Sequence, residues 1–276
     1  MGYAARLRGI GYASPLACHA RGLHCAAMAT KETPISRGVA LSTPLLQRNT
    51  VLASASRAAL TRLSASLELV QLRSGQMLDR ETPRAYFPLT ALLSLHQETS
   101  DGASVQVAMV GREGLAGAWM TGSHASPPVR SRVLLAGTAL ALDAAVLGAE
   151  VSRGGSVMQA VLRHGQELIL QMSQTALCNR HHAIEQQLAR WLLMCTDRLA
   201  TDEVEATQEQ VATLLGVRRE GVTEAAGRLR DAGLIACRRG RFTVLHRHAL
   251  QLRACACYSA SRLDEALRSP RWPVAA

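Results

Sequence analysis

The sequence predicts an α+β chain, with an N-terminal antiparallel β-domain, one long helix and a C-terminal winged helix-turn-helix. Three observations predict this order. Short alternating apolar runs with glycine turns fill residues 67–142. A proline-free stretch, 156–182, carries apolar residues at helical spacing. A capping pattern, a turn glycine and a β-hairpin then follow one another over 207–244. We expect these boundaries: 1–44 a disordered extension, 45–150 the β-domain, 151–182 the long helix, 183–262 the winged helix and 263–276 a tail.

The composition favours a polyanionic partner. The 276 residues include 31 Lys and Arg against 21 Asp and Glu, a formal charge of +10. Such a balance suits nucleic acid, although a general arginine bias of the genome explains it equally well. Aromatic residues make up only 3%, which argues against a single-strand binder that stacks bases on rings. No apolar run is long enough to cross a bilayer, so we expect no membrane partner.

The cysteines and the N-terminus bear on location. Seven cysteines, an odd number, match no secreted disulfide framework and fit a reducing cytoplasm. Residues 1–31 contain arginines and no acid. This pattern resembles a transit peptide or the basic start of a signal peptide, although no sustained apolar segment follows. Translation starting at Met28 is a third interpretation, and each of the three predicts a disordered N-terminus.

The β-domain is expected to contain several half-buried strands. Leu67–Leu72 alternates polar and apolar residues with the period of a strand. Asp101 and Gly102 lie between two alternating runs and indicate a hairpin. Short strands at this spacing are typical of a small antiparallel barrel or sandwich. The other expected strand segments are Tyr86–Pro88, Leu92–His96, Ser104–Val110, Val133–Leu135 and Ala139–Leu142.

The long helix carries an apolar stripe that needs a surface to bury it. Either the β-domain or the same helix of a second subunit supplies that surface. A second helix is expected over 184–199, with Leu188, Trp191, Leu192 and Cys195 on its inner face. The stripe of the long helix consists of Met158, Val161, Leu168, Met172 and Thr175.

Residues 207–244 are the most informative segment. Thr207 and Gln210 form a capping box for a helix over 208–215. Gly216 supplies the positive φ of a sharp turn, and a second helix over 218–231 ends at Gly233. Residues 234–244 read as a hairpin wing with a basic tip. One feature disagrees, because Gly221 and Gly227 inside the second helix each cost about 1 kcal/mol relative to alanine.

Charge supports a duplex-DNA partner for this segment. Between Arg218 and Arg253 the chain has nine arginines and three acids. Arginines at the start of the second helix enter the major groove in this motif and can pair with guanine, whereas wing arginines suit phosphates. The expected DNA-binding residues are Arg218, Arg219, Glu220, Thr223, Glu224, Arg228, Arg238, Arg239 and Arg241.

Other chemistries find little support. The sequence has no nucleophile elbow, phosphate loop or zinc-hydrolase helix, so we expect no enzyme. Cys178 with His181 and His182 suggests a metal only weakly, and Cys255 and Cys257 would diverge on a helix. We therefore predict neither a metal site nor a cofactor. Cys195, on an apolar helix face, is expected in the core.

Four short motifs within residues 45–260 belong together: Tyr86-Phe87-Pro88, Val110–Gly114, Val217–Val222 and Ala254-Cys255-Ala256-Cys257-Tyr258. With them, this part of the chain resembles the Crp/Fnr family of bacterial transcription regulators. The resemblance implies that the β-domain is a β-roll like that of cyclic-nucleotide-binding proteins, and that the long helix is a dimerisation helix. A homodimer would then bury Met158, Val161, Leu168 and Met172 and bind a pseudo-palindromic operator. RNA polymerase is a further expected partner if the protein is an activator.

The resemblance also carries over individual roles. The family's base-reading Arg-Glu pair falls on Arg219 and Glu220, and a second arginine that the family often has is Glu224 here. The operator should therefore differ from the best-known one.

The family's effector pocket carries over less well. Its Gly-Glu and Arg-Ser pairs fall on Gly111 and Glu113, separated by Arg112, and on Arg130 and Ser131. Because this set is imperfect, we predict no tight cyclic AMP binding. An N-terminal iron–sulfur site is not expected either, since the family uses more N-terminal cysteines than Cys18 and Cys25. A sensing module that acts through a protein partner and not through DNA is the alternative function.

Overall fold

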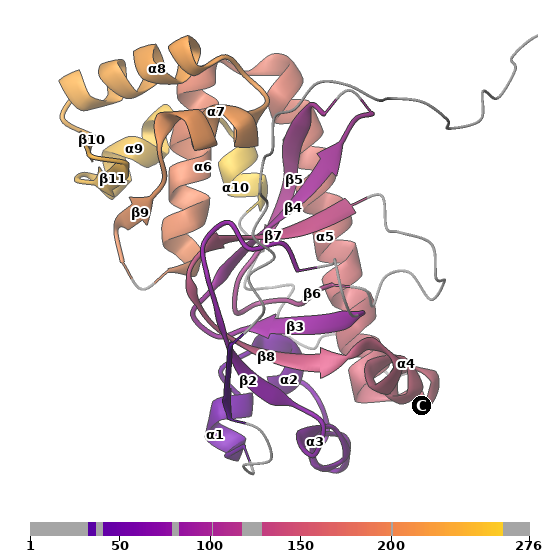
Figure 1. Cartoon of the computed structure of the whole chain (residues 1–276). Helices are drawn as coiled ribbons and strands as arrows, with labels where there is room; N and C mark the ends of the chain where they lie inside the picture. The colour runs from indigo at the N-terminus through magenta and orange to yellow at the C-terminus, as the bar shows by residue number, and fades with distance from the viewer. Residues whose placement is uncertain are drawn as a thin grey trace, which may run out of the picture.

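A computed structural model describes residues 33–36, 41–78, 83–100, 102–117, 129–199 and 201–261. The expectations for Cys18, Cys25, Met28, Asp101 and the 263–276 tail fall outside these residues. A β-domain occupies the lower part of Figure 1, α5 runs along it, and the C-terminal domain lies at the upper left. The elements in chain order are β1 (Thr33–Ser36), α1 (Thr43–Leu46), α2 (Thr50–Ala53), α3 (Arg57–Ser64), β2 (Glu68–Leu72), β3 (Arg84–Pro88), β4 (Leu92–Glu98), β5 (Ser104–Val110), β6 (Ala116–Gly117), β7 (Val129–Leu135), β8 (Gly137–Asp143), α4 (Ala144–Ser152), α5 (Ser156–His181), α6 (Ile184–Arg198), β9 (Glu203–Glu205), α7 (Gln208–Leu215), α8 (Arg219–Asp231), β10 (Ile235–Arg238), β11 (Arg241–Val244), α9 (Arg247–Arg253) and α10 (Cys257–Ser261).

The β-domain contains two antiparallel sheets, as the alternating runs predict. One has the strand order β1-β2-β8-β3-β6 and the other β5-β4-β7. The predicted hairpin is the β4–β5 pair, with Glu98 opposite Ser104 and Gly102 at a φ of 87°. Strand β1 lies within the segment that we expected to be disordered. It is ordered because it hydrogen-bonds to the edge of β2, with Pro34 opposite Val70.

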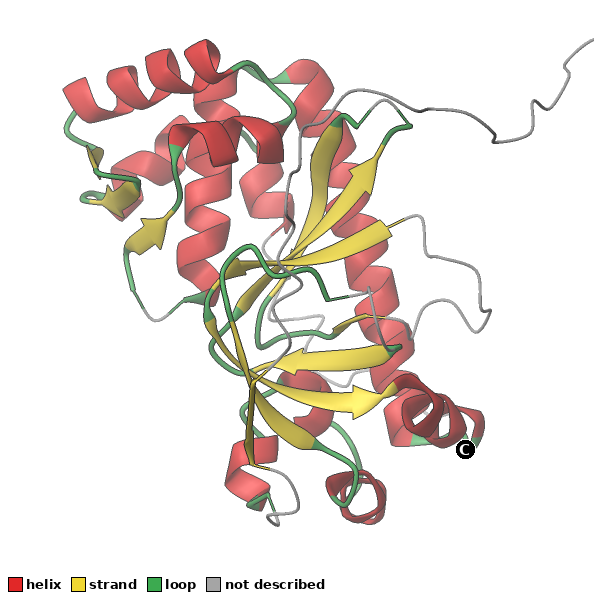
Figure 2. Ribbon diagram, viewed as in Figure 1, coloured by secondary structure: helices red, strands yellow, loops and turns green. Residues whose placement is uncertain are grey.

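Short helices close the lower end of the β-domain, and side-chain caps fix where they begin. Asn49 accepts hydrogen bonds from the first turn of α2, Ser56 caps α3 and Asp143 caps α4. Leucines of α1–α4 then pack against Phe87, Leu140 and Leu142 of the larger sheet. Of these helices, α2 and α4 contact α5 (Figure 2).

Two residues of the apolar stripe of α5 face the β-domain, which is one of the two surfaces that the sequence left open for this stripe. Val161 and Leu168 therefore do not lie in a dimer seam, whereas Met158 and Met172 are partly exposed and their place in a seam stays a prediction. Val161 and Leu168 are only 7% and 2% exposed because they pack on the two β-domain cores, and Met172 lies beside them. Apolar periodicity alone could not distinguish this surface from a second helix. A different set of apolar side chains on α5 is exposed: Leu162, Ile169, Leu170 and Leu177.

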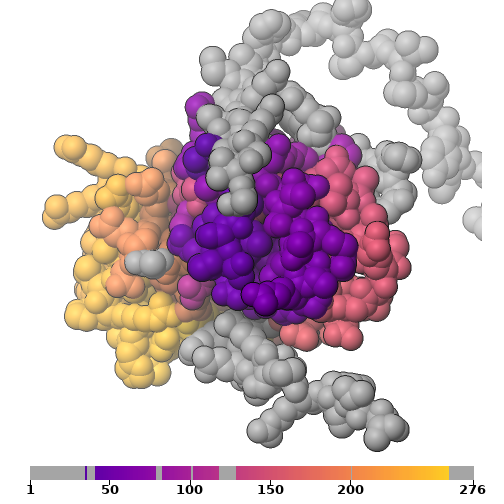
Figure 3. All heavy atoms as spheres, turned by 90° about the horizontal axis from the view of Figure 1, so that it is seen from below, coloured from indigo at the N-terminus to yellow at the C-terminus, as the bar shows by residue number. Residues whose placement is uncertain are grey.

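In the C-terminal domain α6 packs against α8 and α9, and α7 packs against α8. The small sheet of this domain has the order β10-β11-β9. The buried core of the domain includes Leu192, Val222, Leu229 and Phe242. The same buried cluster includes Leu92, Met109 and Leu135 of the β-domain, so the two domains are joined by a continuous apolar core. In Figure 3 the indigo residues occupy the middle of the face, with yellow C-terminal residues on one side and pink residues from the middle of the chain on the other. Within the described residues, no helix is long and apolar enough to cross a membrane.

Candidate nucleic-acid interface

The helix-turn-helix forms as the local sequence predicts. The Thr207 hydroxyl accepts a hydrogen bond from Gln210 N, and the Gln210 side chain accepts one from Thr207 N, so the capping box of α7 is complete. Gly216 ends α7 with a φ of 67°, and Gly233 follows α8 with a φ of 73°. Both are conformations that glycine adopts without steric cost. Helix α8 begins one residue later than expected, at Arg219.

The two glycines inside α8 differ in their surroundings. A Cβ on Gly221 would lie 2.6 Å from Ile184 Cδ1, so this glycine allows α8 to approach the start of α6 closely. A Cβ on Gly227 would meet nothing within 4 Å, and nothing in the structure explains this glycine. Only the first therefore has a packing role.

The start of α8 presents exposed charged side chains. Arg218 is the N-cap residue, Arg219 opens the helix, and both are exposed together with Glu220 and Glu224. The Arg219 side chain is 64% exposed, and its only ion pair with another described residue is a long one, with its Nε 3.7 Å from Glu209 Oε2. Such a pair in water contributes little, so the guanidinium can exchange it for a DNA contact.

The wing divides its three arginines into two kinds. Arg238 and Arg239 are exposed at the β10–β11 turn, where Arg239 and Gly240 have φ values of 46° and 75°. Among the described residues neither has an ion-pair partner. Arg241 is different, because its two terminal nitrogens lie 2.9 Å from Glu203 and 2.7 Å from Glu205 of β9. An open groove between the wing and the start of α8 is lined by Thr207, Glu209, Arg219, Arg238, Arg239 and Arg241, among others.

Two other predicted DNA-binding residues have partners within the protein. The Thr223 hydroxyl lies 2.8 Å from Gln208 Oε1 of α7 and 3.1 Å from the Arg219 carbonyl oxygen. Arg228 donates from Nε to Glu185 of α6 at 2.7 Å. These contacts hold α8 against its neighbours, so both residues help to position the helix.

Residues 186–253 match the family model described as the Crp-like helix-turn-helix domain. This segment is a Crp-like helix-turn-helix domain. The match begins in α6 and ends with α9, so it includes the wing. No curated protein matches the chain by sequence.

About three quarters of the chain has the fold of a solved Crp/Fnr transcription regulator. A regulator of this family from Eubacterium rectale is 15% identical, with a TM-score of 0.60 over 75% of this chain and 98% of that one. FixK2 from Bradyrhizobium japonicum is 15% identical, with a TM-score of 0.58 over 69% and 98%. The c-di-GMP-responsive regulator CLP from Xanthomonas campestris is 13% identical, with a TM-score of 0.55 over 68% and 99%. The β-domain therefore has the β-roll fold of these structures.

The expected effector residues lie apart in the β-roll. Gly111 and Glu113 follow β5, whereas Arg130 and Ser131 lie on β7, with β4 between these strands. Along β4, Val110 pairs with Leu93 but Arg130 pairs with His96. Ser131 is 3% exposed within the sheet. Gly111 and Glu113 thus face a different part of the β-roll from Arg130.

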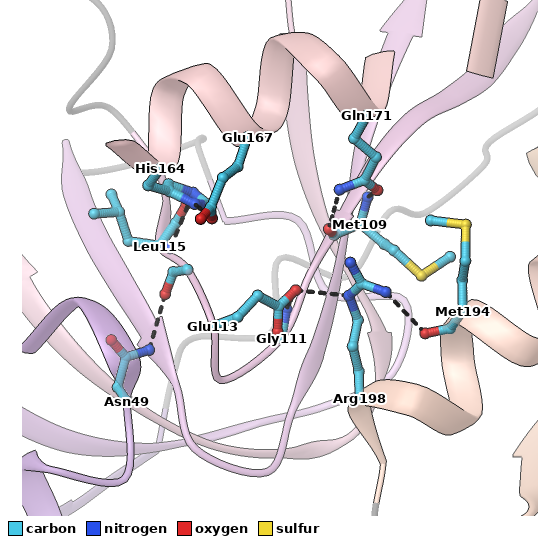
Figure 4. A network of polar contacts seen from close by, with 11 residues as sticks. Asn49, Met109, Gly111, Glu113, Leu115, His164, Glu167, Gln171, Met194 and Arg198 are labelled. Carbon is cyan, nitrogen blue, oxygen red and sulfur yellow. Dashed lines mark hydrogen bonds and ion pairs between the residues drawn. The ribbon is translucent and has the colours of Figure 1, made fainter. Parts of the chain in front are cut away.

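Glu113 is bound to the Crp-like domain (Figure 4). Its Oε1 lies 2.6 Å from Arg198 Nε at the end of α6 and accepts a hydrogen bond from Gly111 N at 3.1 Å. Arg198 also donates to the Met194 carbonyl. The Glu113 side chain is 15% exposed and the Arg198 side chain 9%. Burial alone would raise the pKa of Glu113, but the charge of Arg198 and these hydrogen bonds hold it below its usual value.

Close approaches explain why residues 111–114, the Gly111–Gly114 loop, begin and end with glycine. A Cβ on Gly111 would lie 3.1 Å from Arg198 Cβ, and one on Gly114 would overlap His164 of α5 at 2.1 Å. His164 Nε2 lies 2.8 Å from the Leu115 carbonyl, and Asn49 donates to the Gly114 carbonyl at 2.8 Å. Sequence reasoning missed Asn49, His164 and Arg198. Their partners lie 49 to 85 residues away, and no local pattern marks them.

Proposed function

We propose that the chain is a sequence-specific transcription regulator that binds duplex DNA with the start of α8 and with the wing. The carrying observation is the exposed cationic surface of Arg218, Arg219, Arg238 and Arg239 on a Crp-like helix-turn-helix domain. Arg219 and Glu220 are placed to contact base edges from the first turn of α8. Arg238 and Arg239 suit phosphates on either side of the groove. The proposal places the protein in the cytoplasm, where a bacterial regulator meets its DNA.

Thr223, Arg228, Glu224 and Arg241 have supporting roles in this proposal. Thr223 and Arg228 fix the angle of α8, and Glu224 occupies an exposed position one turn after Glu220. Arg241 is already neutralised by Glu203 and Glu205, so we assign it a weaker phosphate contact than Arg239.

A homodimer is part of the proposal, with the seam on an exposed face of α5 away from Val161 and Leu168. Leu162, Ile169, Leu170 and Leu177 are each at least 50% exposed. At helical spacing they span roughly 100° of the circumference, opposite the face that packs on the β-roll. Dimers are typical of Crp/Fnr regulators, and such a stripe on two parallel helices supports one.

The oligomeric state tests this seam. Ile169→Glu with Leu170→Glu should turn a dimer into a monomer by light scattering, because the charges would face each other in the seam. Leu252→Glu, at a side chain 75% exposed on α9, is the matched control and should stay dimeric. A double variant that remains a dimer would move the seam away from this face of α5.

The effector is not assigned. Two observations support the prediction of weak cyclic AMP binding: Glu113 is already paired with Arg198, and Arg130 lies across β4 from the Gly111–Gly114 loop. Calorimetry with cyclic AMP and cyclic GMP should show no low-micromolar binding. If the protein activates transcription, RNA polymerase is its second partner.

DNA selection with the purified chain tests the function directly. Genomic fragments retained by the protein should share two inverted half-sites about 34 Å apart, the spacing of one helical turn. Retention without any shared sequence would leave a non-specific DNA binder. Failure to retain duplex DNA at low salt would contradict the proposal and favour a sensing module.

A further inference from the structure

Four metal-ligating side chains meet where the long helix joins the Crp-like domain. Cys178 and His182 come from the end of α5, one helical turn apart. Cys255 and Cys257 come from the α9–α10 connection, more than seventy residues later. The ligand atoms of all four lie within 4.8 Å of one another.

The expectation that Cys255 and Cys257 diverge is not met. It assumed that both lie on one helix, but α9 ends at Arg253 and α10 begins at Cys257. Cys255 lies in the turn between them, where its carbonyl accepts a hydrogen bond from Tyr258 N at 2.9 Å. The turn lets both thiols point toward α5. His181, the other histidine considered, is exposed and not part of the group.

The spacing fits one tetrahedral ion. With Zn–S bonds of about 2.3 Å and Zn–N bonds of about 2.0 Å, two sulfurs lie about 3.8 Å apart and a sulfur and nitrogen about 3.5 Å. The Cys178 and Cys255 sulfurs lie 3.6 Å apart, and the Cys257 sulfur lies 3.4 Å from His182 Nδ1. These contacts are too short for ligands spread around an iron–sulfur cube. Three thiols and one imidazole are also a donor set that Zn²⁺ prefers in closed structural sites.

The surroundings are those of a site and not of an apolar core. Cys178, Cys255 and Cys257 are at most 5% exposed, yet they form a buried group of their own, apart from the three larger cores. Tyr258 anchors this turn, because its hydroxyl lies 3.1 Å from both Asp197 Oδ2 of α6 and Arg247 Nη2 of α9. A divalent cation would convert the three buried thiols to thiolates and release protons.

We propose that Cys178, His182, Cys255 and Cys257 bind one Zn²⁺. Two ligands lie before the α5–α6 connection at Ala183 and two lie at the end of the Crp-like domain. The ion therefore fastens the DNA-binding domain to the helix that precedes it. This inference rests on the contacts within the chain and stands whether or not the chain binds DNA.

Metal content of the purified full chain tests the proposal. Protein prepared with a reductant should carry one Zn²⁺ per chain by elemental analysis, removable by chelation under mildly acidic conditions. Co²⁺ added to the stripped protein should give the intense visible absorption of a tetrahedral cobalt–thiolate site. Because ligands must lose protons, the affinity for Zn²⁺ should rise with pH.

Matched variants show which side chains hold the ion. Cys255→Ser and His182→Gln should abolish stoichiometric Zn²⁺ binding and the cobalt thiolate spectrum. Cys237→Ser, on β10, and His181→Gln, next to His182 but exposed, should keep both. Loss of a ligand can also unfold the chain, so the metal-binding titrations on the wild-type chain decide the matter by themselves. Reduced wild-type protein that takes up neither Zn²⁺ nor Co²⁺ would overturn the proposal, as would a Cys178–Cys255 disulfide found in its place.

Discussion

The start of α8 and the Gly111–Gly114 loop use charge in opposite ways. Arg218, Arg219 and Glu220 are exposed on α8 and make at most loose contacts with the rest of the chain. Glu113 is mostly buried and bound at 2.6 Å to Arg198 of the next domain. Exposed, weakly paired charges suit an external polyanion, whereas a buried pair fixes one part of a protein against another. In the proposed function the Crp-like domain therefore recognises DNA, and the Gly111–Gly114 loop couples the β-domain to it.

The largest expected effect comes from breaking the buried pair. Glu113→Gln leaves the Arg198 charge buried without its partner and should lower the free energy of unfolding by about 3 kcal/mol. Glu224→Gln is the matched control, since its pair with Arg228 is long and 73% of the Glu224 side chain is exposed. Urea denaturation measures both. Equal, small losses would show that the loop does not couple the domains.

A second prediction concerns a buried histidine of the β-roll. Burial first, and then the charge of Arg132, lower the pKa of His96 from 6.5 to about 4, against a smaller opposing effect of Glu98. The folded chain thus binds fewer protons than the unfolded chain in this range. The contribution of neutral His96 to the free energy of unfolding is therefore complete above pH 6.5. It falls by at most about 3 kcal/mol as the pH drops to 4.

The pH dependence of this histidine can be isolated by substitution. His96→Gln should flatten the decline of the free energy of unfolding between pH 6.5 and 4, and His248→Gln, at an exposed histidine, should not. Urea denaturation at several pH values measures this. An unchanged decline in His96→Gln would mean that His96 is accessible to protons in the folded protein.

The two glycines of α8 give a smaller effect. Gly227→Ala should raise the free energy of unfolding by about 1 kcal/mol, because alanine favours the helix and meets no neighbour. Gly221→Ala should raise the free energy of unfolding by less than that, or lower it, because Ile184 must move away from the added methyl group. Thermal unfolding of the two variants compares them. A larger gain at Gly221 would mean that α8 is not packed tightly on α6.

The smallest expected effect is a difference between two arginines of the wing in the salt dependence of DNA binding. Arg239→Ala should reduce the slope of log affinity against log salt concentration by about one, the loss of one phosphate contact. Arg241→Ala should change the slope less, because Glu203 and Glu205 already hold Arg241. Titrations with random duplex DNA at several salt concentrations measure both slopes. The reverse order would place Arg241 nearer to the phosphates.

Local signals predicted the Crp-like domain well, and contacts distant in sequence explain the misses. Thr207, Gln210 and Gly216 act within a few residues of their own positions, so α7 and the turn could be read from the sequence. The partner of Glu113 lies 85 residues away, and that of Cys178 lies 77 away. The stripe on α5 was found, but Val161 and Leu168 could face a β-sheet or a second helix equally well. Only the three-dimensional structure distinguishes such surfaces.

Base reading by Arg219 is the central claim, and one titration tests it most directly. Arg219→Ala and Arg239→Ala are each titrated with a selected operator and with random duplex DNA of equal length. Arg219→Ala should cost about 1–3 kcal/mol on the operator and much less on random DNA, whereas Arg239→Ala should weaken both alike. Equal losses for Arg219→Ala on the two DNAs would contradict base reading by Arg219 and leave the fold as described.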